Sequence, residues 1–203
     1  MFDKAIDKAA GIIREGGVVA FPTETFYGLA VDPGQASGLS RLLDIKQRDA
    51  AKGIPVIAAS FEDVERHFIL PEALRDALEK VWPAPLSVAL TPRGQVSKKL
   101  CGDFTSVAVR VSANTLARDL AKRSGGLITA TSANLSGKLP SQDALGVMAQ
   151  LKGTIDYLLD AGKTPGGEPS TIVALENGSL RVYRRGQYDV AKLISITGLS
   201  CLN

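Results

Sequence analysis

The sequence predicts an α/β protein in which a twisted, mixed, open sheet is flanked by helices. Short apolar runs of strand length alternate with segments whose apolar residues recur at helical spacing. Glycine pairs or prolines separate most of these segments. The 203 residues are 45% apolar and 22% charged, which is ordinary for a globular protein that buries a core. We expect one domain over residues 1–203, with its core at about 3–188 and a short C-terminal tail.

The first part of the chain alternates helix, strand and helix. Apolar residues recur on one face over residues 3–15, which predicts a helix, and a pair of glycines follows where a helix ends. The apolar run 18–21 predicts a buried strand that Pro22 ends. Leucines at helical spacing then predict a helix that ends near Lys46.

The middle of the chain predicts three strands and one helix. A short apolar run over residues 55–59 predicts the first strand. Apolar residues at helical spacing predict a helix over 74–81, which Pro83 closes. Two further apolar runs predict strands over 86–90 and 107–111.

The last part of the chain ends in a hairpin. The predicted segments are helices over 115–124 and 142–152, a strand over 127–130, and hairpin strands over 171–175 and 180–183. Ser141 is expected to cap the second of these helices. An Asn-Gly dipeptide supplies the turn of the hairpin. The stretch Gly162–Pro169, rich in glycine and proline, predicts a flexible loop.

Several classes of protein are excluded by composition. No window approaches the ~18 uncharged apolar residues that a membrane span needs, and charged residues interrupt the N-terminal segment where a signal peptide would have its apolar core. Cys101 and Cys201 lie far apart and form no CxxC motif, which argues against a disulfide framework or a cysteine-rich zinc site. We therefore expect a cytoplasmic protein.

The charge balance and the single histidine narrow the function further. A formal net charge of +3 is too weak to indicate a dedicated nucleic-acid-binding protein. A Ser-His-Asp triad or a Cys-His pair would have to use His67, and no nucleophile motif surrounds it. We interpret His67 as a structural residue.

Two segments share a design that is typical of a ligand site. The run 18–21 leads into Thr23-Glu24-Thr25, and the run 127–130 leads into Thr131-Ser132-Ala133-Asn134. Ligands of open α/β sheets bind beyond the carboxyl ends of the strands, so hydroxyls and amides there are candidate ligand contacts. The alternative is that these residues only form turns and helix caps. Two matched strand ends leave both interpretations open.

A third segment supplies positive charge. Lys46, Arg48 and Lys52 stand at the end of a predicted helix, just before the chain returns to the sheet. Cations at a helix C-terminus are usually solvated and favour the helix dipole. Their position near the edge of the sheet also suits a polyphosphate, toward which lysine acts as a point charge and arginine as a planar fork. No Walker motif and no GxGxxG motif accompanies them, so a nucleotide would bind without the usual glycine loop.

These segments together resemble the YrdC/TsaC family of threonylcarbamoyl-AMP synthases. The resemblance is carried by the run FPTETFYGL at 21–29, Lys46-x-Arg48, VAVR at 107–110, SANLSG at 132–137, PSTIV at 169–173 and Arg184. The matching pieces span nearly the whole chain in order. Each piece alone is weak evidence, whereas the combination is specific.

The resemblance implies a fold, a reaction and a set of residues. It implies a twisted α/β sheet with a basic concave cavity, in which L-threonine, bicarbonate and ATP form threonylcarbamoyl-AMP and pyrophosphate. The threonylcarbamoyl group would then pass to tRNA through a partner threonylcarbamoyl-transferase complex. The implied threonine-binding residues are Thr25, Arg110 and Ser170; the implied ATP-binding residues are Arg48, Lys52, Ser106, Ser132, Asn134, Ser141 and Arg184, with Lys46 and Arg48 as the catalytic cations.

The chemistry of that reaction suits a site without histidine. Attack of a carbamate oxygen on the α-phosphorus of ATP depends on alignment and on neutralising charge, as phosphoryl transfer does. We expect Mg²⁺ to arrive with the nucleotide, and the sequence names no metal ligands. Thr23 and Glu24 belong to the matching motif, but the resemblance assigns neither a separate role.

The sequence departs from the family pattern in a few places. Lys52 stands where many longer members have asparagine, and Ile57 where they have histidine; both resemble the short, single-domain members. We expect no additional C-terminal domain. A lid over the nucleotide would then come from elsewhere, for which Gly162–Pro169 is the candidate.

Two alternatives remain open at this stage. The chain could be a module that binds tRNA or other double-stranded RNA through phosphate contacts, without chemistry. It could also be a paralogue that serves another carbamoylation. Threonine-dependent release of pyrophosphate in the absence of RNA separates the synthase from the binding module, and comparing amino acids separates it from the paralogue.

Overall fold

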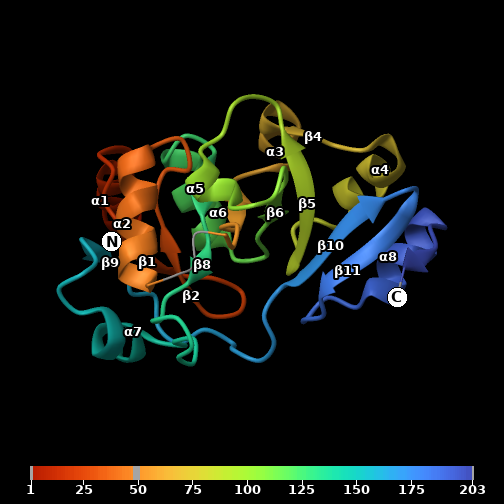
Figure 1. Ribbon diagram of the computed structural model, residues 1–203. Helices are drawn as coiled ribbons and strands as arrows, with labels where there is room; N and C mark the ends of the chain where they lie inside the picture. Colours follow the sequence, from red (N-terminus) through yellow and green to blue (C-terminus); the bar gives the residue numbers. More distant parts are fainter. Residues whose placement is uncertain (1, 48–50, 203) are drawn as a thin grey trace.

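The computed structural model describes residues 2–47 and 51–202, which form a mixed α/β structure (Figure 1). The helices are α1 Phe2–Arg14, α2 Ala36–Lys46, α3 Phe61–His67, α4 Glu72–Val81, α5 Lys98–Cys101, α6 Thr115–Arg123, α7 Ala144–Leu151 and α8 Val190–Thr197. The strands are β1 Val19–Pro22, β2 Tyr27–Ala30, β3 Val56–Ala58, β4 Phe68–Ile69, β5 Leu86–Pro92, β6 Val107–Val111, β7 Leu127–Thr129, β8 Thr131–Ser132, β9 Tyr157–Leu158, β10 Thr171–Glu176, β11 Ser179–Arg184 and β12 Cys201–Leu202. Within these two ranges, no helix is long and apolar enough to cross a membrane.

The predicted α/β class is confirmed, and the strands divide between two sheets rather than forming one. The first sheet has the order β8-β2-β1-β9, and the second contains the path β12-β11-β10-β5-β6-β3-β7, with β4 paired to β5. Both sheets are mixed: β1 pairs antiparallel with β2 and parallel with β9, while β6 pairs parallel with β3 and antiparallel with β5. The last strand of the predicted hairpin, β11, also pairs with β12, so the chain after residue 188 is folded rather than a loose tail.

One helix cap differs from the expectation. Asp143, not Ser141, caps α7, because its carboxylate accepts a hydrogen bond from the backbone N–H of Gly146 at 2.8 Å. Ser141 instead lies two residues earlier, where its backbone oxygen accepts from the N–H of Tyr27 at 2.9 Å. This bond ties the chain before α7 to the start of β2.

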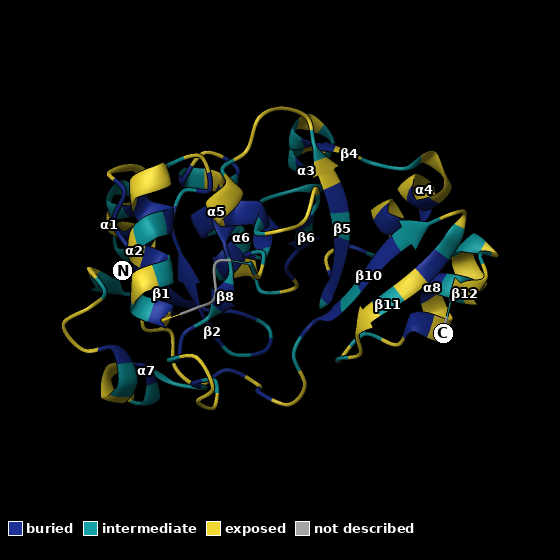
Figure 2. Ribbon diagram, viewed as in Figure 1, coloured by how far each residue is buried: buried dark blue, intermediate teal, exposed yellow. Residues whose placement is uncertain are grey.

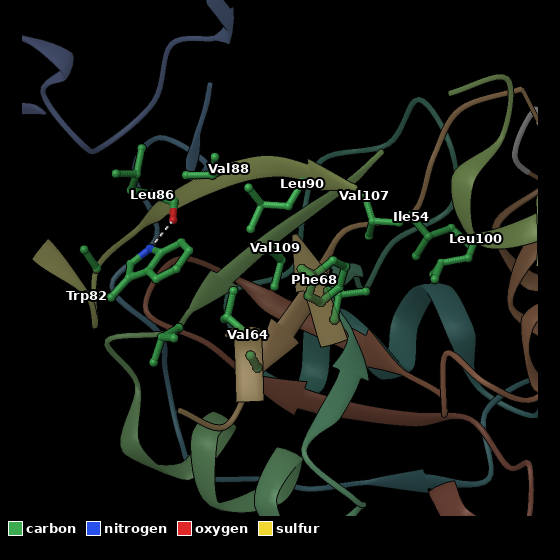
Figure 3. Packing of buried hydrophobic residues seen from close by; sticks show 14 of the residues in the cluster. Ile54, Val64, Phe68, Trp82, Leu86, Val88, Leu90, Leu100, Val107 and Val109 are labelled. Carbon is green, nitrogen blue, oxygen red and sulfur yellow. Dashed lines mark hydrogen bonds between the residues drawn. The ribbon is translucent and has the colours of Figure 1, made fainter. Parts of the chain in front are cut away.

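The larger core packs against one face of the second sheet and extends to buried residues of β1, β2 and α2. Leu86, Val88 and Leu90 alternate along β5 on the side of this core, and valines of β6 do the same (Figure 3). Trp82 follows α4 and donates its indole N–H to the backbone oxygen of Leu86 at 2.7 Å, which satisfies the polar atom of a buried ring. Because strand side chains alternate between faces, Ala89 and Arg110 point to the opposite side.

A second core joins helices α1 and α6 to the strands. Ile13 of α1, Leu120 of α6 and Phe21 of β1 belong to it, and all are fully buried. At its edge, Arg123 of α6 forms ion pairs with Asp3 of α1 at 2.6 Å and with two further carboxylates. Figure 2 shows that β5 and the strands of the first sheet are mostly buried, whereas β11 and the outer faces of α2 and α8 carry exposed residues.

Candidate active site

A cavity of about 440 Å³ is lined from both sheets. The first sheet and its loops contribute residues from Thr23 to Gly28 and from Thr131 to Ser132. The second sheet contributes residues of β5, β6, β10 and β11, among them Ala89 and Arg110, which point away from the larger core. The two matched strand ends singled out in the sequence therefore meet at one cavity.

Arg110 of β6 lies on the wall of this cavity, next to Glu24. Its Nε donates to Glu24 Oε1 at 2.7 Å, and the two side chains are only 5% and 9% exposed. The second carboxylate oxygen, Oε2, accepts a hydrogen bond from the hydroxyl of Ser112, which is fully buried. Glu24 thus has a partner at each oxygen, and it belongs to the loop between β1 and β2.

The environment of Glu24 keeps it ionised. Burial raises the pKa of the Glu24 carboxyl, but the positive charge of Arg110 and the hydrogen bond from Ser112 lower it. The lowering effects win, and the pKa lies below its ordinary value of 4.5. A charged carboxylate therefore faces a charged guanidinium in a site that is nearly closed to water.

Two threonines of the same loop are also held in place. Thr25, predicted to bind threonine, lies with its hydroxyl 3.2 Å from that of Thr23. Thr23 accepts from the backbone N–H of Thr25 at 3.1 Å and donates to the backbone oxygen of Phe26 at 2.7 Å. Both line the cavity, so the loop presents hydroxyls there in a fixed conformation.

Ser170 and Arg184, both predicted site residues, are hydrogen-bonded to each other. Arg184 of β11 donates from Nε to the backbone oxygen of Ser170 and from a terminal nitrogen to its hydroxyl, each at 3.0 Å. The Ser170 hydroxyl also lies 3.3 Å from that of Ser87. Gly186 allows this approach, since a Cβ there would lie 2.1 Å from the backbone oxygen of Pro169.

Lys46, predicted as a catalytic cation, lies against the Ser132–Asn134 segment and is 4% exposed. Its Nζ donates to the backbone oxygen of Ser132 at 2.6 Å, to the Ser132 hydroxyl at 3.3 Å and to Asn134 Oδ1 at 2.8 Å. Asn134 in turn donates from Nδ2 to the backbone oxygen of Leu135 at 2.9 Å. The lysine therefore organises the loop after β8, whose Ser132 lines the cavity.

The remaining predicted residues are spread more widely. Ser106 lines the cavity. Ser141 is buried and is not part of the cavity lining; its backbone oxygen accepts from Tyr27 of β2, and its hydroxyl accepts from the Gln150 side chain at 3.4 Å. Lys52 is exposed, and its backbone forms a bridge with Gly102. Arg48 lies outside the described residues.

The stretch Gly162–Pro169, expected as a flexible loop and candidate lid, is hydrogen-bonded to the segments of Thr25, Tyr27 and Gln142, and its Pro169 lines the cavity. The N–H of Gly166 donates to the backbone oxygen of Thr25 at 2.7 Å, and the Tyr27 hydroxyl donates to the backbone oxygen of Gly162 at 2.7 Å. Thr164 is buried and donates from its N–H to the backbone oxygen of Gln142 at 2.8 Å. These bonds make the loop a support for the 23–27 segment.

Two kinds of site residue had no assignment from the sequence. Glu24 stood inside the matching motif, and only its contact with Arg110 reveals a role. Phe104 and Tyr183 line the cavity while being 57% and 54% exposed, which is unusual for aromatic side chains. The sequence gives no sign of a role for Phe104 or Tyr183, because each is a single aromatic residue outside any motif.

A second cavity, of about 390 Å³, is lined by Arg66, His67 and Arg93 among other residues. Arg93 caps α3, because its Nε donates to the backbone oxygens of Glu65 at 2.8 Å and Phe68 at 3.0 Å. Arg66 is paired with Asp63 at 3.2 Å. Arg66 and Arg93 therefore have partners within the fold. His67 lines the same cavity, apart from the candidate active site.

A resident metal site is not found in the part of the chain that the structure describes. No group of three or more histidine, cysteine, aspartate or glutamate residues there could hold an ion. The carboxylate of Glu24, which lies behind the cavity-lining Arg110, is hydrogen-bonded to Arg110 and Ser112.

The fold and the site define a class of two-sheet α/β proteins with one shared cavity. Residues 11–186 match the model of the Sua5/YciO/YrdC family, whose description is telomere recombination. The chain belongs to this family, as the motifs of the sequence indicated.

Individual relatives sharpen this assignment. The chain is 40% identical over 167 residues to the threonylcarbamoyl-AMP synthase of Nitrosococcus oceani, which covers 81% of this chain and 89% of that protein. It is similar to the crystal structure of P. abyssi Sua5 complexed with L-threonine, with a TM-score of 0.92 and 33% identity over 98% of this chain. The match spans 59% of the P. abyssi chain, less than two thirds of its length.

A more distant relative supports the fold alone. E. coli YciO has a TM-score of 0.84 and 21% identity, and the match covers 94% of this chain and 93% of that one.

Proposed function

We infer that the chain is an L-threonylcarbamoyladenylate synthase, which forms threonylcarbamoyl-AMP and pyrophosphate from L-threonine, bicarbonate and ATP. The observation that carries this function is the meeting of two kinds of site at one cavity. Arg110 and the residues Thr25 and Ser170, which carry hydroxyls, line it together with Ser132, to which Lys46 donates. The 40% identity to the N. oceani synthase supports the same reaction.

The threonine side suits an amino-acid carboxylate. Arg110 offers a guanidinium, whose planar donors match a carboxylate in a two-point contact. The hydroxyls of Thr23, Thr25 and Ser170 are polar partners for the rest of the substrate. We assign threonine binding to Thr25, Arg110 and Ser170 on this basis.

The nucleotide side suits phosphate. Lys46 and Arg184 supply positive charge, and Ser132 and Asn134 supply neutral hydrogen-bonding groups; Arg48, Lys52, Ser106 and Ser141 complete the proposed ATP contacts. In the reaction, the threonine amine attacks the carbon of bicarbonate and water is lost, which gives a carbamate. A carbamate oxygen then attacks the α-phosphorus and pyrophosphate leaves. The residues contribute alignment and charge neutralisation, which dominate such transfers.

Mg²⁺ enters this scheme as the counter-ion of ATP. Mg²⁺ commonly binds through substrate phosphates and retains several waters, and so it needs no cage of protein carboxylates. The described residues fit that mode, since they offer hydroxyls and cations around the cavity rather than clustered carboxylates.

The product is reactive and must be used by another protein. We propose that a threonylcarbamoyl-transferase complex takes the group to tRNA, so that the chain acts in the cytoplasm in the formation of N6-threonylcarbamoyladenosine. A direct contact with tRNA is a separate matter that the reaction does not require.

The experiment that tests this function is product analysis without RNA. The purified chain is mixed with MgATP, bicarbonate and L-threonine, and the products are identified by mass spectrometry together with a pyrophosphate assay. We expect threonylcarbamoyl-AMP and stoichiometric pyrophosphate, both dependent on threonine. Omission of bicarbonate and replacement of threonine by serine or valine are the controls.

Other results would change the assignment. Pyrophosphate release with equal rates for several amino acids would indicate a paralogue with another carbamoylation. No release, together with salt-dependent binding of double-stranded RNA, would indicate the binding module.

A further inference from the structure

We propose that Glu24 is a positioning residue of the threonine subsite: it holds the guanidinium of Arg110 by Nε, so that the two terminal nitrogens serve the substrate carboxylate. This inference rests on the proposed function, because it concerns how that subsite binds threonine. It gives a role to a residue for which neither the sequence pattern nor the reaction supplies one.

The contact joins the two sheets across the cavity wall. Glu24 lies in the loop between β1 and β2 of the first sheet, and Arg110 lies in β6 of the second. They are 86 residues apart in sequence, and their 2.7 Å contact is nearly closed to solvent. An ion pair in this position is screened little by water or salt, and therefore orients its members more strongly than a surface pair.

The carboxylate of Glu24 is engaged at both oxygens. Oε1 accepts from Arg110, and Oε2 accepts from the buried hydroxyl of Ser112, two residues further along the same chain segment as Arg110. This arrangement fixes the plane of the carboxylate. A carboxylate used in this way acts on the substrate through Arg110 rather than by taking a proton itself.

The geometry of a guanidinium then determines which edge remains. Arginine has five N–H donors, one on Nε and two on each terminal nitrogen. Since Glu24 takes the Nε position, a second carboxylate can make a two-point contact only along the edge formed by the two terminal nitrogens. Among the described residues, neither terminal nitrogen of Arg110 has a hydrogen-bond partner, and Arg110 lines the cavity.

The variant Glu24→Gln tests this role. The amide keeps the size of the side chain but removes the charge that holds the guanidinium. We expect the KM for threonine to rise about tenfold or more, while the KM for ATP stays within about twofold, because small errors in substrate alignment have large effects. Ser112→Ala, which frees one carboxylate oxygen, should raise the threonine KM by a smaller factor.

The matched control is Glu65→Gln. Glu65 also pairs with an arginine Nε, that of Arg75, at 2.8 Å, which is close to the Glu24–Arg110 distance. In contrast to that buried pair, the side chains of Arg75 and Glu65 are 45% and 34% exposed. Circular dichroism and thermal unfolding confirm that each variant is folded, and Ser112→Ala carries the test if Glu24→Gln does not fold.

The outcomes separate this proposal from the proposed function. If the wild-type chain makes threonylcarbamoyl-AMP and the folded variants keep the threonine KM within twofold, the role of Glu24 is wrong. An equal rise in the KM values of threonine and ATP would also contradict it, since that would indicate general damage to the cavity. If the wild-type chain makes no product, the synthase function fails, and the threonine subsite fails with it.

Discussion

Two buried cations differ in the partners to which they donate: Arg110 lines the cavity, and Lys46 lies behind its Ser132 wall. Lys46 and Arg110 are each 4% exposed. Lys46 donates to three oxygens without formal charge, on Ser132 and Asn134, whereas Arg110 donates to the carboxylate of Glu24. The ammonium group thereby shapes a loop, while the guanidinium forms an ion pair across two sheets.

The difference shows two ways of keeping a cation inside a protein. A lysine has three rotatable donors that can satisfy several carbonyl and hydroxyl oxygens of one loop. An arginine is a rigid fork, so one anionic partner at Nε fixes its direction and leaves an edge for a ligand. Under the proposed function, Lys46 would therefore act on the nucleotide side through its charge and through the loop that it holds, whereas Arg110 would contact the threonine carboxylate directly.

The largest expected effect comes from breaking the ion pair. Glu24→Ala should lower the free energy of unfolding by about 3–5 kcal/mol, because it leaves the Arg110 charge buried without its anion. Urea unfolding measures this value. The double variant Glu24→Ala/Arg110→Ala should lose less than the sum of the two single variants. Additive losses would mean that the two side chains do not stabilise each other.

The next effect concerns the other cation. Lys46→Ala should reduce threonine-dependent pyrophosphate release roughly 100-fold, because three oxygens of the Ser132–Asn134 segment lose a charged donor. The assay is run on protein whose folding is checked by thermal unfolding. Activity within a few-fold of wild type would show that the loop keeps its shape without the lysine.

A smaller effect is expected where the fit depends on the backbone. Gly186→Ala would bring a Cβ to 2.1 Å from the backbone oxygen of Pro169, so the segment must move away from Ser170. We expect pyrophosphate release to fall about tenfold as Arg184 shifts from its two contacts with Ser170. Gly94→Ala is the control, since a Cβ there meets no atom within 4 Å. Equal activity of the two variants would contradict the prediction.

The smallest expected effect is a pH dependence of the unfolding free energy. It concerns Arg110, which pairs with the carboxylate of Glu24. The pKa of Glu24 lies below its ordinary value of 4.5, so the stabilisation from its charge is present above pH 4.5 and is lost as the pH falls through the lowered value. The difference in unfolding free energy between wild type and Glu24→Gln should therefore narrow below pH 4.5. Urea unfolding at pH 7, 5 and 3.5 measures it. A difference that widens in acid would mean that Glu24 binds its proton more tightly in the folded state.

Much of the fold was predictable from local patterns. The helical period of residues 3–15 and 74–81 matches α1 and α4, and the Asn-Gly turn lies between β10 and β11. The cap of α7 was missed, because Ser141 and Asp143 are both good capping residues and only the start of the helix at Ala144 decides between them. The division into two sheets was also missed, since short strands carry no signal for the partner they pair with.

The candidate site was also partly predictable from local sequence patterns. Thr25, Ser132 and Arg110 could be named from motifs, since hydroxyls at strand ends and an arginine within a strand are visible in one dimension. Their meeting at one cavity and the partnership of Arg110 with Glu24 depend on residues 86 apart. The predicted loop at Gly162–Pro169 is present, and its hydrogen bond to the backbone of Thr25 could not be predicted from a glycine-rich composition.

By itself, the amino-acid sequence determined the α/β class, most helices and strands, and the family, because periodicity and motif order are properties of neighbouring residues. The tertiary structure alone decided that Lys46 donates to the Ser132–Asn134 loop and that Glu24 takes the Nε of Arg110. The physical reason is that burial and charge pairing depend on distances between atoms brought together by folding, whereas separation along the chain does not specify those distances.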